Sequence, residues 1–120
     1  PPHFTAKGAK VQHTLLSEGC EIAGNVSESV LFSDVKVAKN ANVEYSILMP
    51  GAVVEEGASV RYAIVASGAV IAKGAQVGEG PSDCDVDKWG VAVVAENVRI
   101  GENVKLAAKE MAGEDIPDAK

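Results

Sequence analysis

Residues 43–65 read VEYSILMPGAVVEEGASVRYAIV, and this stretch decides the fold because it contains one pattern twice. The pattern aligns Val43 with Val60, Tyr45 with Tyr62 and Leu48 with Val65. Aliphatic residues recur at steps of five or six residues in the column Val37, Val43, Leu48, Val54, Val60, Val65, Ile71 and Val77. Three such steps make one closed turn, so the repeat predicts a solenoid with three sides per turn.

A second column, three places before the aliphatic one, consists of glycine, asparagine and aspartate. These residue types best tolerate positive φ, which a sharp corner of the backbone requires. The column contains Gly8, Asp34, Asn40, Gly51, Gly57, Gly68, Gly74, Asn97 and Asn103. Each is followed by alanine or valine, which suits a small apolar side chain inside a tight bend. The two columns together predict a triangular coil with branched aliphatic side chains in its middle.

The pattern predicts one all-β domain over residues 1–120, a single-stranded parallel β-helix of hexapeptide repeats. We expect regular coils over 4–77, a loop over 78–90, a final coil over 91–106 and a tail over 107–120. The step from Leu16 to Val26 is shorter than in later coils, so the first coil should be irregular. The tail, anchored by Met111 and Ile116, should form a short helical turn or fray, and it should cap the open strand edges.

The sides that are five residues long have different residues at one corner. Their column contains His13, Glu28, Tyr45 and Tyr62, each followed by a small residue. At the spacing of about 4.8 Å between stacked strands, His13, Tyr45 and Tyr62 should form a ladder on the outside of this corner. Two interpretations remain open: the ladder stabilises the stack, or these three residues form an interface with another domain.

The composition disfavours several classes of partner and location. Charged residues make up 23% of the chain and the net charge is −6, so no basic surface is available for nucleic acid or an acidic membrane. No apolar run approaches the roughly 20 residues that span a bilayer, and the first residues lack a signal-peptide pattern. Cys20 falls in the inward column, in register with Val37, whereas Cys84 lies in the polar loop, so we expect no disulfide and a cytoplasmic location.

No assembled active site is visible in the sequence. The glycines recur at corner spacing and form no phosphate-binding loop. His3 and His13 are too few for a complete histidine metal site. Trp89 is expected to anchor the loop on the rod, because a large ring in a loop usually needs an apolar surface. The sequence therefore predicts no catalytic residue, no metal site and no cofactor within this chain.

Several segments, taken in order, carry a resemblance to a known family. They are Pro1-Pro2-His3-Phe4, Ser17-Glu18-Gly19-Cys20, residues 25–32, Ser46-Ile47-Leu48-Met49-Pro50 and Tyr62-Ala63-Ile64-Val65. They resemble the carboxyl-terminal domain of bacterial glucose-1-phosphate adenylyltransferase, also called ADP-glucose pyrophosphorylase. The resemblance implies that the β-helix is left-handed, whereas the usual crossover rule would have predicted a right-handed connection.

The resemblance also implies a function. The intact enzyme would transfer adenylyl from ATP to glucose 1-phosphate, giving ADP-glucose and pyrophosphate for glycogen synthesis, with Mg²⁺ in an amino-terminal nucleotidyltransferase domain that this chain lacks. The β-helix, inactive by itself, would contact that catalytic domain, support a homo-oligomer or a hetero-oligomer with a paralogous subunit, and bind an anionic metabolite effector. Because guanidinium suits phosphate, Arg61 is the first candidate for binding the effector, followed by Arg99 and Lys105.

Two alternatives remain open. Hexapeptide-repeat acyltransferases have the same rod, act as trimers and place acyl-coenzyme A and a catalytic histidine between adjacent rods. The absence of histidine from residues 14–120 weighs against this class. The other alternative is a noncatalytic regulatory or scaffold paralogue of the enzyme, which only the amino-terminal half would distinguish.

Overall fold

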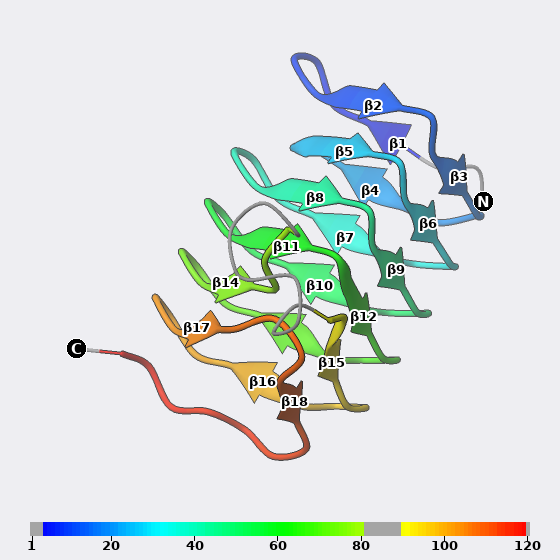
Figure 1. Cartoon of the computed structure of the whole chain (residues 1–120). Helices are drawn as coiled ribbons and strands as arrows, with labels where there is room; N and C mark the ends of the chain where they lie inside the picture. The colour runs from blue at the N-terminus through cyan, green and yellow to red at the C-terminus, as the bar shows by residue number, and fades with distance from the viewer. Residues whose placement is uncertain (1–3, 81–89, 120) are drawn as a thin grey trace.

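The computed structural model describes residues 4–80 and 90–119, and these residues wind into a left-handed parallel β-helix (Figure 1). Each turn contributes one short strand to each of three parallel sheets, so the predicted fold class is confirmed. Three sheets of six strands are present in the described residues. Cys84 and Trp89 lie outside those residues.

The three sheets are named here A, B and C in the order in which the chain visits them. Sheet A contains β1 (Phe4–Thr5), β4 (Glu21–Ile22), β7 (Lys36–Val37), β10 (Val53–Val54), β13 (Val70–Ile71) and β16 (Arg99–Ile100). Sheet B contains β2 (Lys10–Gln12), β5 (Asn25–Ser27), β8 (Asn42–Glu44), β11 (Ser59–Arg61), β14 (Gln76–Val77) and β17 (Lys105–Leu106). Sheet C contains β3 (Leu15–Leu16), β6 (Val30–Leu31), β9 (Ile47–Leu48), β12 (Ala63–Val65), β15 (Ala92–Val94) and β18 (Met111–Ala112).

The core lies along the axis of the rod, where one residue of every strand points inward. In β10, Val54 is fully buried and pairs in register with Val37 below and Ile71 above. The same relation holds for Val60 between Val43 and Val77 in sheet B. Burying such a side chain stabilises the fold by roughly 1.5–3 kcal/mol, so the stacked aliphatic columns are the main source of stability.

The predicted corner residues all have positive φ, between 58 and 92°. At several corners an asparagine or aspartate lies above a glycine of the preceding coil. A Cβ atom built on Gly68 would come within 2.3 Å of the Asn97 side-chain oxygen, so the glycine provides space for that amide. Positive φ also occurs at Gly19 (79°), Gly78 (83°) and Lys109 (71°), which the predicted column of glycine, asparagine and aspartate does not include.

The predicted shortening between Leu16 and Val26 is present, but it falls in the second coil and not the first, and the register assumed for Cys20 was wrong. Ile22, rather than Cys20, pairs with Val37. Cys20 lies two residues before Ile22, directly after the corner residue Gly19. The N–H of the next residue, Glu21, donates to the carbonyl of Val35. The chain shortens between β4 and β5, where a Cβ on Gly24 would meet the carbonyl oxygens of Ala41 and Ala38 at 2.5 and 2.6 Å. The absence of a Cβ at Gly24 therefore allows this shortened corner to pack against the backbone of the next coil.

The C-terminal segment differs from the expected helical turn. The coil continues past Leu106 into β18, in which Ala112 is buried and Met111 faces outward. The tail then runs beside β16: the N–H of Ile116 donates to the Arg99 carbonyl at 2.9 Å, and the N–H of Gly101 donates to the Ile116 carbonyl at 2.8 Å. This segment occupies the outer edge of sheet A, which would otherwise expose unpaired backbone groups.

Candidate functional site

The corner between sheets B and C, named here the B–C corner, consists of His13, Glu28, Tyr45 and Tyr62. All four have φ between 45 and 50°, so the backbone turns through the left-handed region without glycine. The small residues that follow explain how this is stabilised. The Ser46 hydroxyl donates to the carbonyl of Glu44 at 2.8 Å and accepts the N–H of Ala63 at 3.3 Å, joining two coils.

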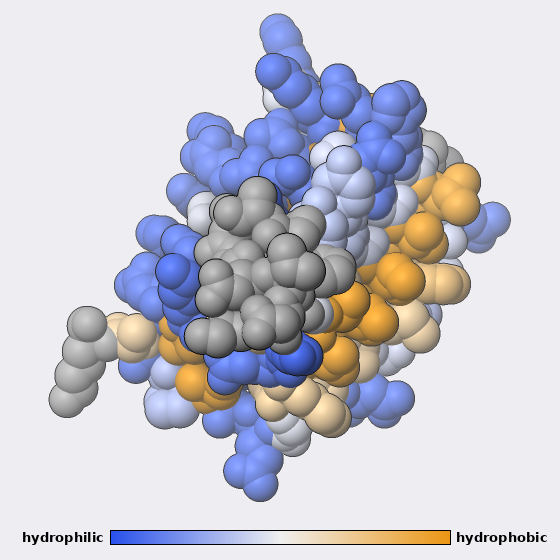
Figure 2. All heavy atoms as spheres, in the orientation of Figure 1, coloured by the Kyte–Doolittle hydropathy of each residue, from blue (hydrophilic) through white to orange (hydrophobic). Residues whose placement is uncertain are grey.

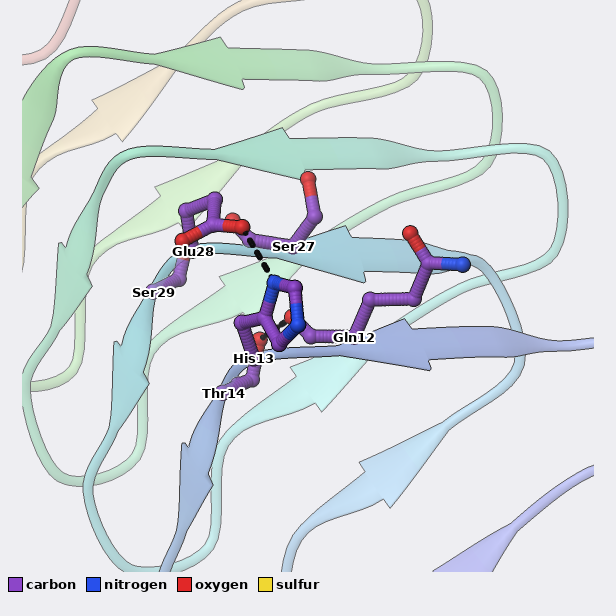
Figure 3. Close-up of polar contacts among 6 residues, drawn as sticks. All are labelled: Gln12, His13, Thr14, Ser27, Glu28 and Ser29. Carbon is purple, nitrogen blue, oxygen red and sulfur yellow. Dashed lines mark hydrogen bonds and ion pairs between the residues drawn. The ribbon is translucent and has the colours of Figure 1, made fainter.

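The side chains of the B–C corner form two pairs on the outside of the rod. The rings of Tyr45 and Tyr62 are stacked, with centroids 4.8 Å apart and planes inclined by 10°. His13 Nδ1 lies 2.6 Å from Glu28 Oε1, and Figure 3 shows both side chains extending from neighbouring coils. The predicted ladder of His13, Tyr45 and Tyr62 is therefore interrupted by Glu28, whose coil lies between those of His13 and Tyr45.

A cavity of 430 Å³ opens beside this corner and extends onto sheet C. It is lined by both members of the His13–Glu28 pair, by Tyr45 and by the outward aliphatic side chains of the first three strands of sheet C. The cavity thus joins a polar corner to an apolar surface.

That apolar surface is the outward side of sheet C, named here the C face. Every outward residue of its described strands is aliphatic or methionine: Leu15, Val30, Ile47, Ile64, Val93 and Met111. Leu15 and Met111 are 71 and 70% exposed, and Ile47 and Ile64 are 38 and 37% exposed. Figure 2 shows hydrophobic residues gathered in a band that follows sheet C on the right of the view.

The C face was not predicted from the sequence, although the sequence contains a signal for it. In hexapeptide repeats only the inward position must be aliphatic, so an aliphatic residue directly before it is informative. Ile47-Leu48, Ile64-Val65 and Val93-Val94 are such doublets on sheet C, and Val53-Val54 and Val70-Ile71 are such doublets on sheet A. The doublets are therefore only a partial signal, and the stacking of turns is needed to show that every described outward residue of sheet C is aliphatic or methionine.

Sheet B places two of the three predicted effector-binding residues around one cavity of 260 Å³. Arg61 and Lys105 line it together with Ser59, Gln76 and Glu79. One Glu79 carboxylate oxygen accepts the N–H of Ala108 at 3.3 Å, which directs that oxygen toward the backbone. The cavity therefore presents two cationic side chains, one carboxylate and two neutral hydrogen-bonding side chains on one side of the rod.

Arg99, the third predicted effector-binding residue, lies on sheet A and contacts the C-terminal tail. Its Nη1 donates to Asp118 Oδ1 at 3.0 Å, and the same carboxylate oxygen accepts the N–H of Glu102 at 2.7 Å. The hydrogen bond to Asp118 raises the pKa of Arg99. The N–H of Glu102, followed by the Arg99 guanidinium, lowers the pKa of Asp118. The structure gives Arg99 a role in holding the tail and does not bring it to the Arg61–Lys105 cavity.

Among the described residues, Cys20 has a structural role and the acidic, histidine and cysteine side chains form no metal site. Cys20 is buried, and its thiol donates to the carbonyl of Phe32 with the sulfur 3.0 Å from the oxygen. No group of three histidine, cysteine, aspartate or glutamate side chains in residues 4–80 and 90–119 is arranged to hold a metal ion. Over the same residues, the chain contains no helix with the length and apolar character needed to cross a membrane.

Comparisons with known proteins agree on the fold and overlap only in part on activity. A 40-residue segment, 33% of the chain, is 52% identical to glucose-1-phosphate adenylyltransferase of Bacillus subtilis, and a 39-residue segment is 49% identical to the enzyme of the same name from Thermotoga maritima. These matches span 10 and 9% of the relatives, so the chain represents a small part of their length. WeeI from Acinetobacter baumannii shares the fold, with a TM-score of 0.63 and 16% identity over 92% of this chain and 49% of that one.

The family model described as GlmU-like, C-terminal hexapeptide, matches residues 3–92. Its span begins just before β1 and ends at the first residue of β15, so it includes the inward columns of the first four turns and those of sheets A and B in the fifth. The chain therefore belongs to the GlmU-like family of C-terminal hexapeptide domains.

Proposed function

We propose that this chain is the C-terminal β-helix domain of a glucose-1-phosphate adenylyltransferase, where it supports subunit assembly and responds to an effector. The whole enzyme would make ADP-glucose and pyrophosphate from ATP and glucose 1-phosphate for glycogen biosynthesis. The observation that carries the proposal is the 40-residue segment that is 52% identical to the Bacillus subtilis enzyme.

In this proposal the chemistry takes place in a separate nucleotidyltransferase domain. Mg²⁺ would assist adenylyl transfer in that domain. The β-helix would contribute contacts with its own catalytic domain and with identical or paralogous subunits. The net charge of −6 disfavours nucleic acid and acidic membranes as partners, and the proposed location is the cytoplasm.

The Arg61–Lys105 cavity is the best candidate for an anionic effector site. A guanidinium group donates two parallel hydrogen bonds to a phosphate, and an ammonium group adds a second cation. Ser59 and Gln76 in the same lining match the hydroxyl groups of a sugar phosphate. The placement of Arg61 and Lys105 on β11 and β17, on either side of β14, supports a sugar phosphate or related anion as the effector.

The direct test is an assay of ADP-glucose formation from ATP, glucose 1-phosphate and Mg²⁺. We expect activity from the longest natural polypeptide that contains this sequence and none from residues 1–120 alone. Failure of the long polypeptide to form ADP-glucose would refute the assignment. Activity of the 120-residue chain would refute the noncatalytic role.

The effector site is tested by titrating sugar phosphates into the same long polypeptide. We expect Arg61→Ala and Lys105→Ala to raise the half-activating concentration about 10-fold each, the loss of one charge-assisted contact. Lys10→Ala is the matched control, since Lys10 also faces outward from sheet B but lies three strands away from the nearest strand of the cavity. Arg99→Ala should leave activation unchanged, and equal effects of all four variants would contradict this site.

Acyl transfer is a second candidate function, favoured by one observation. The Glu28 carboxylate is placed to accept Nδ1–H of His13 at 2.6 Å, which would orient the ring and leave Nε2 to accept a proton beside the 430 Å³ cavity. If this function holds, the chain releases coenzyme A thiol from acetyl-coenzyme A in the presence of an amino-sugar acceptor, and His13→Gln abolishes the release. Under the adenylyltransferase proposal, no thiol is released by either protein.

A further inference from the structure

We infer that the C face binds a second copy of this chain, face to face, about a two-fold axis parallel to the strands of sheet C. This inference deepens the assembly role proposed above by naming the surface and the partner. The first evidence is that the C face is apolar over the whole height of the described rod, from β3 to β18 (Figure 2). An apolar band this continuous is unusual on a surface that contacts only water.

The second evidence is the order of the outward side chains along the C face. From β3 to β18 they read Leu, Val, Ile, Ile, Val, Met. Two Ile residues lie in the middle, a Val lies beside each, and a long unbranched-at-Cβ side chain lies at each end. The series is therefore nearly the same in both directions, which is the property that a self-complementary two-fold interface requires.

The geometry of the sheet turns this symmetry into specific contacts. A two-fold axis parallel to the strands, midway between β9 and β12, reverses the order of the coils in the partner. Leu15 then faces the partner's Met111, Val30 faces the partner's Val93, and Ile47 faces the partner's Ile64. The long and more exposed residues meet at the two ends, and the flatter β-branched residues meet in the middle.

Charge favours this face over the other two as the contact between copies. With a net charge of −6, two copies repel each other. A contact between uncharged faces adds no further cost, because no charge has to be desolvated there. The described strands of sheet C carry no charged outward residue, whereas sheet A presents Glu21, Lys36 and Arg99, and sheet B presents Lys10 and Lys105.

The size of the face is adequate for a stable dimer. The rod measures 39 × 28 × 22 Å along its principal axes. One side therefore offers on the order of 600–900 Å², comparable with the roughly 800 Å² that each partner buries in an interface of standard size. The stacked Tyr45 and Tyr62 rings and the His13–Glu28 pair border it along the B–C corner and supply an aromatic and polar rim.

The oligomeric state is tested by sedimentation equilibrium of the 120-residue chain, which has a complete core along the described rod. We expect the mass of two chains. Ile64→Lys should raise the dissociation constant at least 100-fold, because it places an ammonium group in the centre of the apolar contact. Val70→Lys is the matched control: it puts the same charge on an outward aliphatic position of sheet A and should leave the dimer unchanged.

The register is tested by cysteine cross-linking in chains that also carry Cys84→Ser. An equimolar mixture of Leu15→Cys and Met111→Cys chains should form a disulfide-linked pair, whereas Leu15→Cys alone should not, because the two copies of Leu15 lie about 24 Å apart along the stack. Cross-linking of Leu15→Cys to itself would indicate a different axis and overturn the proposed register.

Other results would overturn the inference itself. The mass of one chain would show that the C face does not bind its own copy, and it would leave the catalytic domain as the occupant. The mass of three chains would exclude the two-fold arrangement. The proposed enzymatic function is tested separately, since ADP-glucose formation by the long polypeptide can succeed or fail whichever mass is found.

Discussion

Sheets B and C have the same backbone but opposite outer surfaces. Both are parallel, and their inward columns consist of valine, leucine and, at one end, alanine. The outward column of sheet B reads Lys, Asn, Asn, Ser, Gln, Lys, whereas that of sheet C is aliphatic or methionine throughout. The difference shows that the repeat requires only inward and corner residues and leaves the outward positions available for function.

The outward side chains of the two sheets are stabilised differently, by hydrogen bonds on sheet B and only by burial on sheet C. In sheet B, the amide of Asn25 donates to the amide oxygen of Asn42 at 3.1 Å, along the stacking direction. Water completes the hydrogen bonds of such exposed groups, so a polar column is stable in a free rod. In sheet C the outward side chains offer no hydrogen bonds, and only burial against another surface would lower their free energy.

The largest effect should come from an inward residue, where the two sheets are alike. Leu48→Ala in sheet C should destabilise the chain by about 2–5 kcal/mol, because it removes buried methyl groups and leaves a cavity in a closed coil. Urea unfolding at low protein concentration measures the change. Ile47→Ala, one residue earlier but facing outward, is the matched control and should cost less than about 1 kcal/mol. Equal losses would mean that the two sides of sheet C are not distinct.

The next largest effect on stability should come from Gly78, directly after strand β14 of sheet B. Gly78 has φ 83°, and an added Cβ would lie 1.9 Å from the Arg61 carbonyl oxygen. Gly78→Ala should therefore cost about 2 kcal/mol or more, from backbone strain plus the clash. The comparison is Gly57→Ala, with φ 73° and no atom within 4 Å of the added Cβ, which should cost only about 1 kcal/mol of strain. Urea midpoints that fall equally would contradict the role of the close contact.

A smaller effect is expected from making sheet B resemble sheet C. The double variant Asn42→Ile, Ser59→Ile should keep the stability of the single chain within about 1 kcal/mol, because isoleucine suits an exposed strand position. It should, however, add a second apolar surface, and sedimentation should detect species larger than those of the unchanged chain. Asn42→Thr, Ser59→Thr keeps a β-branched but polar surface and should not. If both double variants sediment like the parent, outward apolarity does not control association.

The smallest effect concerns the tail that covers sheet A. The pKa of Asp118 is lowered in the folded chain, so its carboxylate stabilises the tail above the unfolded pKa of about 4, and this contribution is lost as pH falls through the folded value. The protection of the Glu102 and Ile116 amides from hydrogen exchange, measured relative to the intrinsic rate at each pH, should therefore fall in acid. Asp118→Asn should show faster exchange already at pH 7 and a weaker dependence on acid. Identical profiles for both chains would exclude this carboxylate as the cause.

Much of the fold followed from residues that obey a local steric rule. Glycine, asparagine and aspartate identified the nine predicted corners because few other residues adopt positive φ without strain. The rule failed at Lys109, where stacking on the preceding coils imposes a left-handed turn on an unfavourable residue, and β18 was missed with it. The wrong register of Cys20 has a related cause, since the length of a shortened side depends on how Gly24 packs against the next coil.

The candidate site was less predictable than the core. The sequence identified Arg61, Lys105 and the B–C corner as exposed residues of interest, but their neighbours lie on other coils. Only the stacking of turns brings Arg61 and Lys105 to one cavity, pairs Arg99 with Asp118 and places Glu28 between His13 and Tyr45.

The sequence by itself determined the period, the three-sided coil and the inward columns of this protein, because backbone sterics and aliphatic burial act within a few residues of each position. The tertiary structure decided which outward residues share a face. A sheet of this rod collects one residue from every turn, so a surface such as the C face exists only after residues about seventeen apart have been stacked in register.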